Sequence, residues 1–181
     1  MENSLKMPFF KGKKEKILFS VFAVLTVSVM IVIFIFSSEK AEDSSKTSGG
    51  VIKMVLTTFY SNFEDMPKEE QINLVSGLQH FARKFAHGSI YFMLSLFCTG
   101  AVLQIQRYKT RNKIIASFLF TVFYAATDEI HQLFVPGRAC RLKDVFIDSS
   151  GSFLGAVVML GIYLFIKFLS GKKNKYLLQK S

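Results

Sequence analysis

The chain has 181 residues, of which 50% are hydrophobic and 20% are charged, and its formal net charge is +10. The apolar residues gather in runs of about 20, the length of helix that crosses roughly 30 Å of hydrocarbon. This distribution excludes a soluble globular enzyme and a disordered chain. The sequence therefore predicts an all-α, polytopic membrane protein with four transmembrane helices and one amphipathic helix between the first and second spans.

The first predicted span covers residues 17–36, which carry no charge and follow a basic tail at 1–16. Its apolar core is longer than that of a signal peptide, and no small-residue cleavage site follows, so we expect an uncleaved anchor. Residues 37–50 are polar and end in two glycines, which predicts a mobile linker. Residues 51–63 place apolar side chains at three- and four-residue intervals. This pattern predicts an amphipathic helix, too short to span, that lies at the interface or against the bundle.

A new helix is predicted to begin at Pro67, which is followed by Glu69 and Glu70. We expect it to continue into the second span, at about 85–103, and expect further spans at 114–134 and 145–169. Residues 37–80 would then form the linker and amphipathic helix, residues 81–169 a three-helix core, and residues 170–181 a second basic tail.

Basic residues concentrate in the N-terminal tail, in the loop at 107–113 and at the C-terminal end. Four spans place these three segments on one side of the membrane, and the positive-inside rule makes that side cytoplasmic. We therefore expect a multi-pass protein of the plasma membrane with both termini in the cytoplasm. Because the basic segments are explained as topology signals, we expect no nucleic-acid partner.

The other polar residues of the core recur three or four positions apart in three spans, so each set shares a helical face. At ~1.5 Å per residue, all three sets lie about 22–30 Å from the cytoplasmic basic residues, near the outer headgroup boundary. Charges at membrane depth cost ~2.5 kcal/mol or more each, so we expect them to face the bundle and to have partners. The sets are Arg83, His87 and Tyr91; Asp128, Glu129 and Gln132; and Asp144 and Asp148.

The loop between the third and fourth spans adds Arg138 at the same level, and Pro136-Gly137 before it predicts a tight turn. In the fourth span, Gly151 and Gly155 form a GxxxG pattern that would let another helix approach closely. The sequence thus predicts a polar cup that faces outward above a packed bundle.

His87, Glu129 and Asp148 are the candidate catalytic residues of this cup. His87 suits a general base or nucleophile at a lipid phosphoester, and suits equally a buried hydrogen bond between helices. Consecutive helical residues point about 100° apart, so we expect only one of Asp128 and Glu129 to reach a given substrate atom. We favour Glu129 for acid–base chemistry and Asp128 for pairing with a cation.

Arg138 has the planar fork that binds phosphate, although an interfacial arginine could also meet anionic lipid in the bilayer. Asp144 could orient Arg138, bind a metal, or favour a helix N-terminus. The cofactor is left open: a divalent cation is compatible with carboxylates and a histidine, but no ligand spacing requires one. The residues expected to bind substrate are Arg83, Lys84, Tyr91, Asp128, Gln132, Arg138 and Asp144.

These residues form three ordered motifs that resemble the VanZ-like (teicoplanin-resistance) membrane family. The motifs are similar to RKxAHFxxY, DExxQxFxPGR and D-xxx-D/N-xx-G-xxx-G, and together they cover about 81–169. Gly88 occupies the position where the family usually has Phe, so we expect one packing contact to differ. The matching residues are Arg83, Lys84, Ala86, His87 and Tyr91; Asp128, Glu129, Gln132, Phe134, Pro136, Gly137 and Arg138; and Asp144, Asp148, Gly151 and Gly155.

The resemblance implies an influence on the outer-leaflet envelope and on susceptibility to teicoplanin-type glycopeptides. It also implies, by fold-level analogy with membrane enzymes that act on lipid headgroups, phosphotransfer or hydrolysis on a lipid headgroup or a lipid-linked cell-wall precursor. The alternative is a non-catalytic protein that binds lipid or modulates a membrane partner. A minimal transporter is less favoured because the charges cluster on one side. The expected partners are membrane lipids or lipid-linked precursors; protein partners and oligomeric state are left open.

Overall fold

The computed structural model describes residues 8–178, with side chains as far as residue 170, and the regular structure of this stretch is helical throughout. Helices α1, α3, α4 and α5 contain segments long and apolar enough to cross a membrane. The predicted all-α fold with four spans is therefore confirmed. The helices are α1 (Lys13–Ser37), α2 (Ala41–Phe59), α3 (Lys68–Leu103), α4 (Thr110–Gln132) and α5 (Leu142–Leu178).

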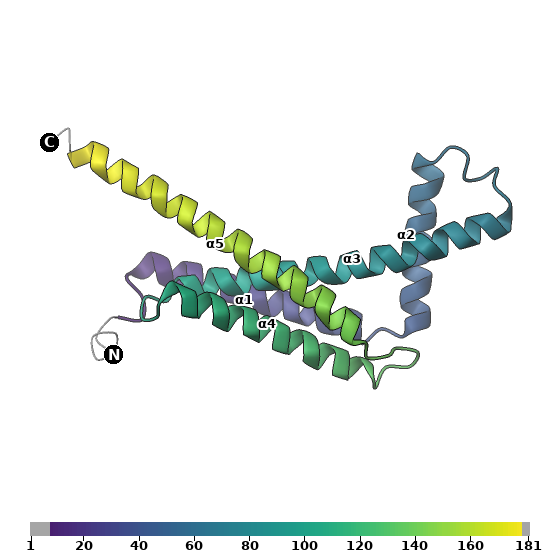
Figure 1. The fold of residues 1–181 in the computed structure, drawn as a ribbon, viewed down its shortest axis with the longest axis horizontal. Coiled ribbons are helices and arrows are strands. Elements are labelled where there is room, and N and C mark those ends of the chain that lie inside the picture. The colour runs from purple at the N-terminus through teal and green to yellow at the C-terminus, as the bar shows by residue number, and fades with distance from the viewer. Residues whose placement is uncertain (1–7, 179–181) are drawn as a thin grey trace.

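Helix α3 is the central element, because it contacts each of the other helices and packs most extensively against α5. Figure 1 shows α1, α4 and the first part of α5 alongside it, while the remainder of α5 extends away from the bundle. Helix α2 crosses α3 at one end of the bundle (Figure 1). We call this the α2 end; α1 and α4 finish there, and α5 begins there.

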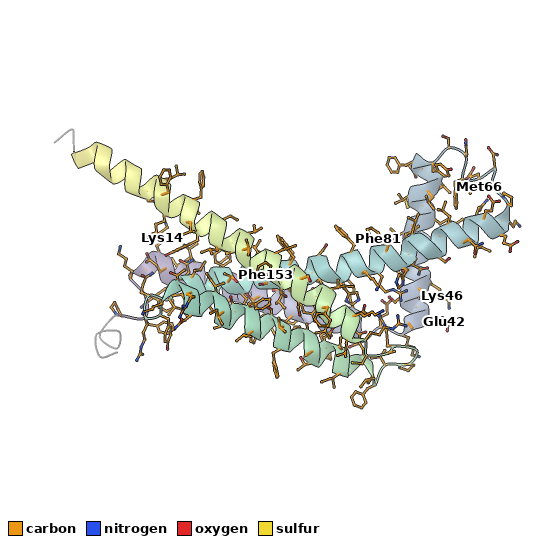
Figure 2. The ribbon with its side chains drawn as sticks, in the orientation of Figure 1. Lys14, Glu42, Lys46, Met66, Phe81 and Phe153 are labelled. Carbon is orange, nitrogen blue, oxygen red and sulfur yellow. The ribbon has the colours of Figure 1, made fainter. Side chains whose placement is uncertain are left out.

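The bundle is apolar on its outer surface, and its interior contains buried polar and charged groups beside a small hydrophobic core. Large hydrophobic side chains project from the spans, among them Phe81 and Phe153 (Figure 2). Asp128, Glu129 and Asp148, in contrast, are at most 5% exposed. This distribution suits helices that present apolar side chains to hydrocarbon and keep their polar groups inside the protein.

The predicted mobile linker at 37–50 is wrong, because helix α2 begins at Ala41. Only residues 38–40 connect α1 to α2. The serines that suggested a mobile segment instead bind α3. Gln79 Nε2 donates to Ser45 O and to Ser48 Oγ, at 2.7 Å in each case. These contacts outweigh the low helix propensity of Ser and Gly. The helix ends at Phe59, four residues before its predicted end.

The predicted helix start near Pro67 is confirmed, because Pro67 is the N-cap of α3. This helix runs without interruption through 36 residues, so its first half extends past the other spans and supports α2 (Figure 1). Helix α5 continues to Leu178, so the predicted basic tail at 170–181 is helical as far as the structure describes it.

The two glycines of the GxxxG pattern make the α3–α5 contact possible. A Cβ atom at Gly151 would overlap the carbonyl oxygen of Gly88, and one at Gly155 would overlap that of Phe92. The close approach predicted from the pattern is thus confirmed. A Cβ at Gly88 itself would lie 3.4 Å from Ile147 Cγ2, so this departure from the family motif concerns a contact with α5.

Candidate functional site

A polar cavity of about 100 Å³ lies at the α2 end, where α3, α4, α5 and the α4–α5 loop converge. It brings together most of the residues predicted for the polar cup, from segments far apart in sequence. Tyr91 and Asp128 do not line this cavity: Tyr91 is fully buried in the bundle, and Asp128 borders a second cavity described below. The predicted residues on its wall are Arg83, Lys84, His87, Glu129, Gln132, Arg138, Asp144 and Asp148.

The turn after α4 places Arg138 over this cavity. Arg138 N–H donates to Val135 O at 3.1 Å, and Gly137 between them has a φ of +77°, a conformation that favours glycine. The predicted Pro136-Gly137 turn is therefore confirmed. Pro136 O in turn accepts the N–H of Ala41 at 3.3 Å, which ties this loop to the start of α2.

Arg138 already binds the protein's own main chain. Its Nε donates to Glu39 O in the α1–α2 connection at 3.2 Å, and its Nη2 donates to Phe36 O in the last turn of α1 at 3.3 Å. Burial, and then the nearby Arg83, lower its pKa from the ordinary 12.5. A guanidinium nevertheless stays charged in proteins. Arg138 thus supplies positive charge to the cavity while part of its donor fork holds α1 to the α4–α5 loop.

The buried carboxylates differ in how their oxygens are used. Glu129 Oε2 accepts the main-chain N–H of Arg141 at 2.8 Å, and Asp128 Oδ2 accepts from Gln132 Nε2 at 3.3 Å. Asp148 is 0% exposed, and neither of its oxygens has a hydrogen-bond partner among the described residues. The sequence favoured Glu129 for chemistry, whereas the structure leaves more unused acceptor capacity on Asp148.

The cations on α3 are only partly paired. Arg83 Nη2 donates to Ser45 Oγ at 3.0 Å, while its buried Nε has no partner within the described part of the chain. Lys84 Nζ lies 4.0 Å from Asp144 Oδ1, and both side chains are about one third exposed, so this ion pair is weak. His87 lines the same cavity as these two cations and as Glu129, Asp144 and Asp148.

A second, larger cavity of about 400 Å³ lies between α1, α2 and α3, and most of its wall is apolar. It shares Arg83, His87 and Arg138 with the polar cavity, so the two spaces adjoin. Sequence reasoning missed this cavity because one of its walls is the first half of α2, which was expected to be a linker.

Sequence reasoning also missed polar residues deeper in the bundle. Ser95 and Thr99 are fully buried and continue the four-residue repeat of Arg83, His87 and Tyr91, which is the signal that could have identified them. The hydroxyls of Thr99 and Ser117 are 2.9 Å apart, in the interface between α3 and α4.

The structure adds no support for a bound cation. Within residues 8–178, no group of three or more His, Cys, Asp or Glu side chains is placed to hold a metal ion. Of the three histidines, His80 and His87 line the polar cavity, whereas His131 points to α1: its Nε2 is 3.1 Å from Ser38 Oγ, and its ring lies 5.0 Å from that of Phe34.

Comparison with known proteins gives one family. The family model VanZ/LLP1 matches residues 22–167, a stretch that contains both cavities and most of the four spans. No curated protein and no solved structure matches the chain. The match covers most of the sequence and agrees with the resemblance of the three motifs, so this chain is a member of the VanZ/LLP1 family.

Proposed function

We propose that this protein binds an amphiphile of the outer leaflet through its polar cavity and acts on the phosphate-bearing headgroup, thereby influencing susceptibility to teicoplanin-type glycopeptides. The observation that carries the proposal is the unused binding capacity of the cavity. Arg83 Nε and both oxygens of Asp148 are buried without protein partners among the described residues. Such groups are costly to bury at membrane depth unless a ligand or water satisfies them.

The charges in the cavity suit a phosphate ester. Arg83, Lys84 and Arg138 offer positive charge for the phosphate, and guanidinium donors bind phosphate oxygens well. The carboxylates on the opposite wall can accept hydrogen bonds from hydroxyl or ammonium groups elsewhere in the headgroup. A phosphorylated lipid or a lipid-linked cell-wall precursor has both kinds of group.

The same cavity contains residues that can move protons. In the reaction that we propose, His87 takes the proton of an attacking water or alcohol whose oxygen forms a bond to phosphorus. The bond from phosphorus to the leaving oxygen breaks, and a carboxyl group returns a proton to that oxygen. We assign this second role to Asp148, because the contact between Glu129 and Arg141 gives Glu129 a structural role.

The proposed orientation places the α2 end outside the plasma membrane. The basic loop at 107–113 and the start of α1 lie at the opposite end of the bundle, so the positive-inside rule supports cytoplasmic termini. The polar cavity would then open toward the outer leaflet, where glycopeptides meet their target.

His87→Ala tests this function through teicoplanin susceptibility. We expect the variant to lose the protein's effect on susceptibility while its abundance in the membrane stays unchanged, because the half-buried side chain borders a cavity. Asn112→Ala, at an exposed position near the other end of α4, is the control and should behave as wild type. A His87→Ala protein that is fully abundant and fully effective would contradict the proposal.

A non-catalytic binding protein is the second candidate, and one observation favours it. Arg138 and Glu129 use polar atoms to hold main-chain segments together, and Asp128 bonds to Gln132 within α4. If the cavity only binds lipid, expression of the protein should change susceptibility without changing the chemical composition of the membrane lipids.

A further inference from the structure

We infer that the apolar cavity between α1, α2 and α3 holds a hydrocarbon chain of the same lipid whose phosphate headgroup occupies the polar cavity. This inference rests on the proposed function and narrows its substrate class. The ligand would be a membrane lipid bound with part of its chain inside the protein, rather than a soluble phosphate or a headgroup reached from the bilayer surface.

The wall of the apolar cavity is suited to a hydrocarbon chain. Ala82 and Ala86 lie one turn apart on α3, and their small side chains leave space for the cavity. Ile90 continues the same face of the helix. The cavity volume of about 400 Å³ falls within the range of ligand pockets. The apolar residues of the facing wall are Ile33 and Phe36 of α1 and Val51 and Ile52 of α2.

The junction between the cavities is what points to a single amphiphilic ligand. Arg83, His87 and Arg138 line both spaces, so a bound molecule can place its phosphate at the junction and its chain beyond it. The buried Nε of Arg83, which has no partner in the described structure, lies at this boundary. A phosphate at the junction would lie beside the Arg83 guanidinium.

Helix α2 links the two parts of the proposed site. Arg83 donates to Ser45 Oγ at 3.0 Å, and Gln79 binds Ser45 and Ser48, so the polar side of α2 is fixed to α3 beside the junction. Val51 and Ile52 of the same helix line the chain cavity together with Ser44, Thr47 and Ser48. The contact that positions α2 thus also positions Arg83 for the headgroup.

The test uses two photoreactive lipids with the full-length protein in phosphatidylcholine vesicles. One probe is a phosphatidylglycerol with a diazirine in its acyl chain, and the other is a diacylglycerol with the same chain but no phosphate. We expect the phosphatidylglycerol probe to label residues around Ile33, Val51 and Ile90 several-fold more than the diacylglycerol probe does. Equal labelling by the two probes, or labelling spread evenly over the spans, would overturn the inference.

Ala86→Phe fills the cavity and should reduce this labelling several-fold. Ala116→Phe is the matched control, because Ala116 is exposed on α4 and lines neither cavity, and it should leave the labelling unchanged. Unchanged labelling in Ala86→Phe would overturn the inference. If this variant fails to fold, the comparison of the two probes on wild-type protein still tests the chain site.

The failure of the chain site and that of the proposed function are distinguishable. If His87→Ala loses the effect on susceptibility but the two probes label equally, only the chain site is wrong. If the phosphatidylglycerol probe labels the cavity selectively but His87→Ala keeps its effect, the chain site stands and the proposed function is wrong.

Discussion

Buried polar groups have different hydrogen-bond partners at the two ends of the bundle. At the end opposite α2, the hydroxyls of Thr99 and Ser117 bond to each other, and Lys113 Nζ donates to Leu103 O at 3.3 Å. At the α2 end, Arg83 Nε and both Asp148 oxygens have no protein partner among the described residues, and the hydroxyls of Tyr91, Ser95 and Ser152 extend this unpartnered set toward the middle of the bundle. Buried polar groups that form hydrogen bonds with each other stabilise helix packing. Buried polar groups without a protein partner can form hydrogen bonds with a ligand or water. The contrast explains why we place function at the α2 end.

The largest expected effect concerns the orientation of these two ends. Replacing both native cysteines and introducing Lys46→Cys on α2 or Thr110→Cys at the start of α4 gives single labelling sites at opposite ends. We expect an impermeant thiol reagent to reach position 46 in intact cells and position 110 only after the membrane is opened. The reverse pattern would remove the polar cavity from the outer leaflet.

A smaller but still strong effect should follow from forcing α3 and α5 apart behind the cavity. Gly155→Leu inserts a side chain where even a Cβ would overlap Phe92 O, and overpacking of this kind costs about 1–3 kcal/mol or more. We expect lower thermal stability in detergent and lower abundance. Gly161→Leu, at a glycine with open space around it, should have little effect. Equal stability of the two variants would contradict the close helix contact.

The smallest effect is expected at the end where polar groups bond to each other. Thr99→Val removes the hydrogen bond with Ser117, and such bonds between membrane helices average about 0.6 kcal/mol. We expect a slightly lower unfolding temperature and an unchanged effect on glycopeptide susceptibility. Loss of the susceptibility effect in an abundant Thr99→Val protein would mean that function is not confined to the α2 end.

Apolar runs of about 20 residues were enough to predict four spans, and the Pro136-Gly137 pair was enough to predict the turn. Helical periodicity, with depth counted along each helix, predicted the convergence of most of the polar residues. What it could not predict depends on contacts between distant segments. The first half of α2 is helical because Ser45 and Ser48 bind Gln79, 31 or more residues away, and the apolar cavity exists only once α2 is in place.

The relative roles of the carboxylates were equally beyond the sequence. Glu129 holds the main chain of Arg141 because of the path taken by the loop between them, and no spacing rule indicates that path. Ser95 and Thr99, in contrast, continue a visible four-residue repeat and could have been included.

Lipid mass spectrometry of membranes that contain wild-type protein, Asp148→Asn or no protein tests whether the polar cavity acts on a phosphate-bearing lipid. The Asn side chain keeps the volume of Asp148 but can no longer carry the carboxyl proton. We expect wild-type protein to change the abundance of at least one phosphate-bearing lipid or lipid-linked precursor, and an equally abundant Asp148→Asn protein to leave that abundance unchanged. Lipid profiles that are the same in all three membranes, or a full change with Asp148→Asn, would contradict this expectation.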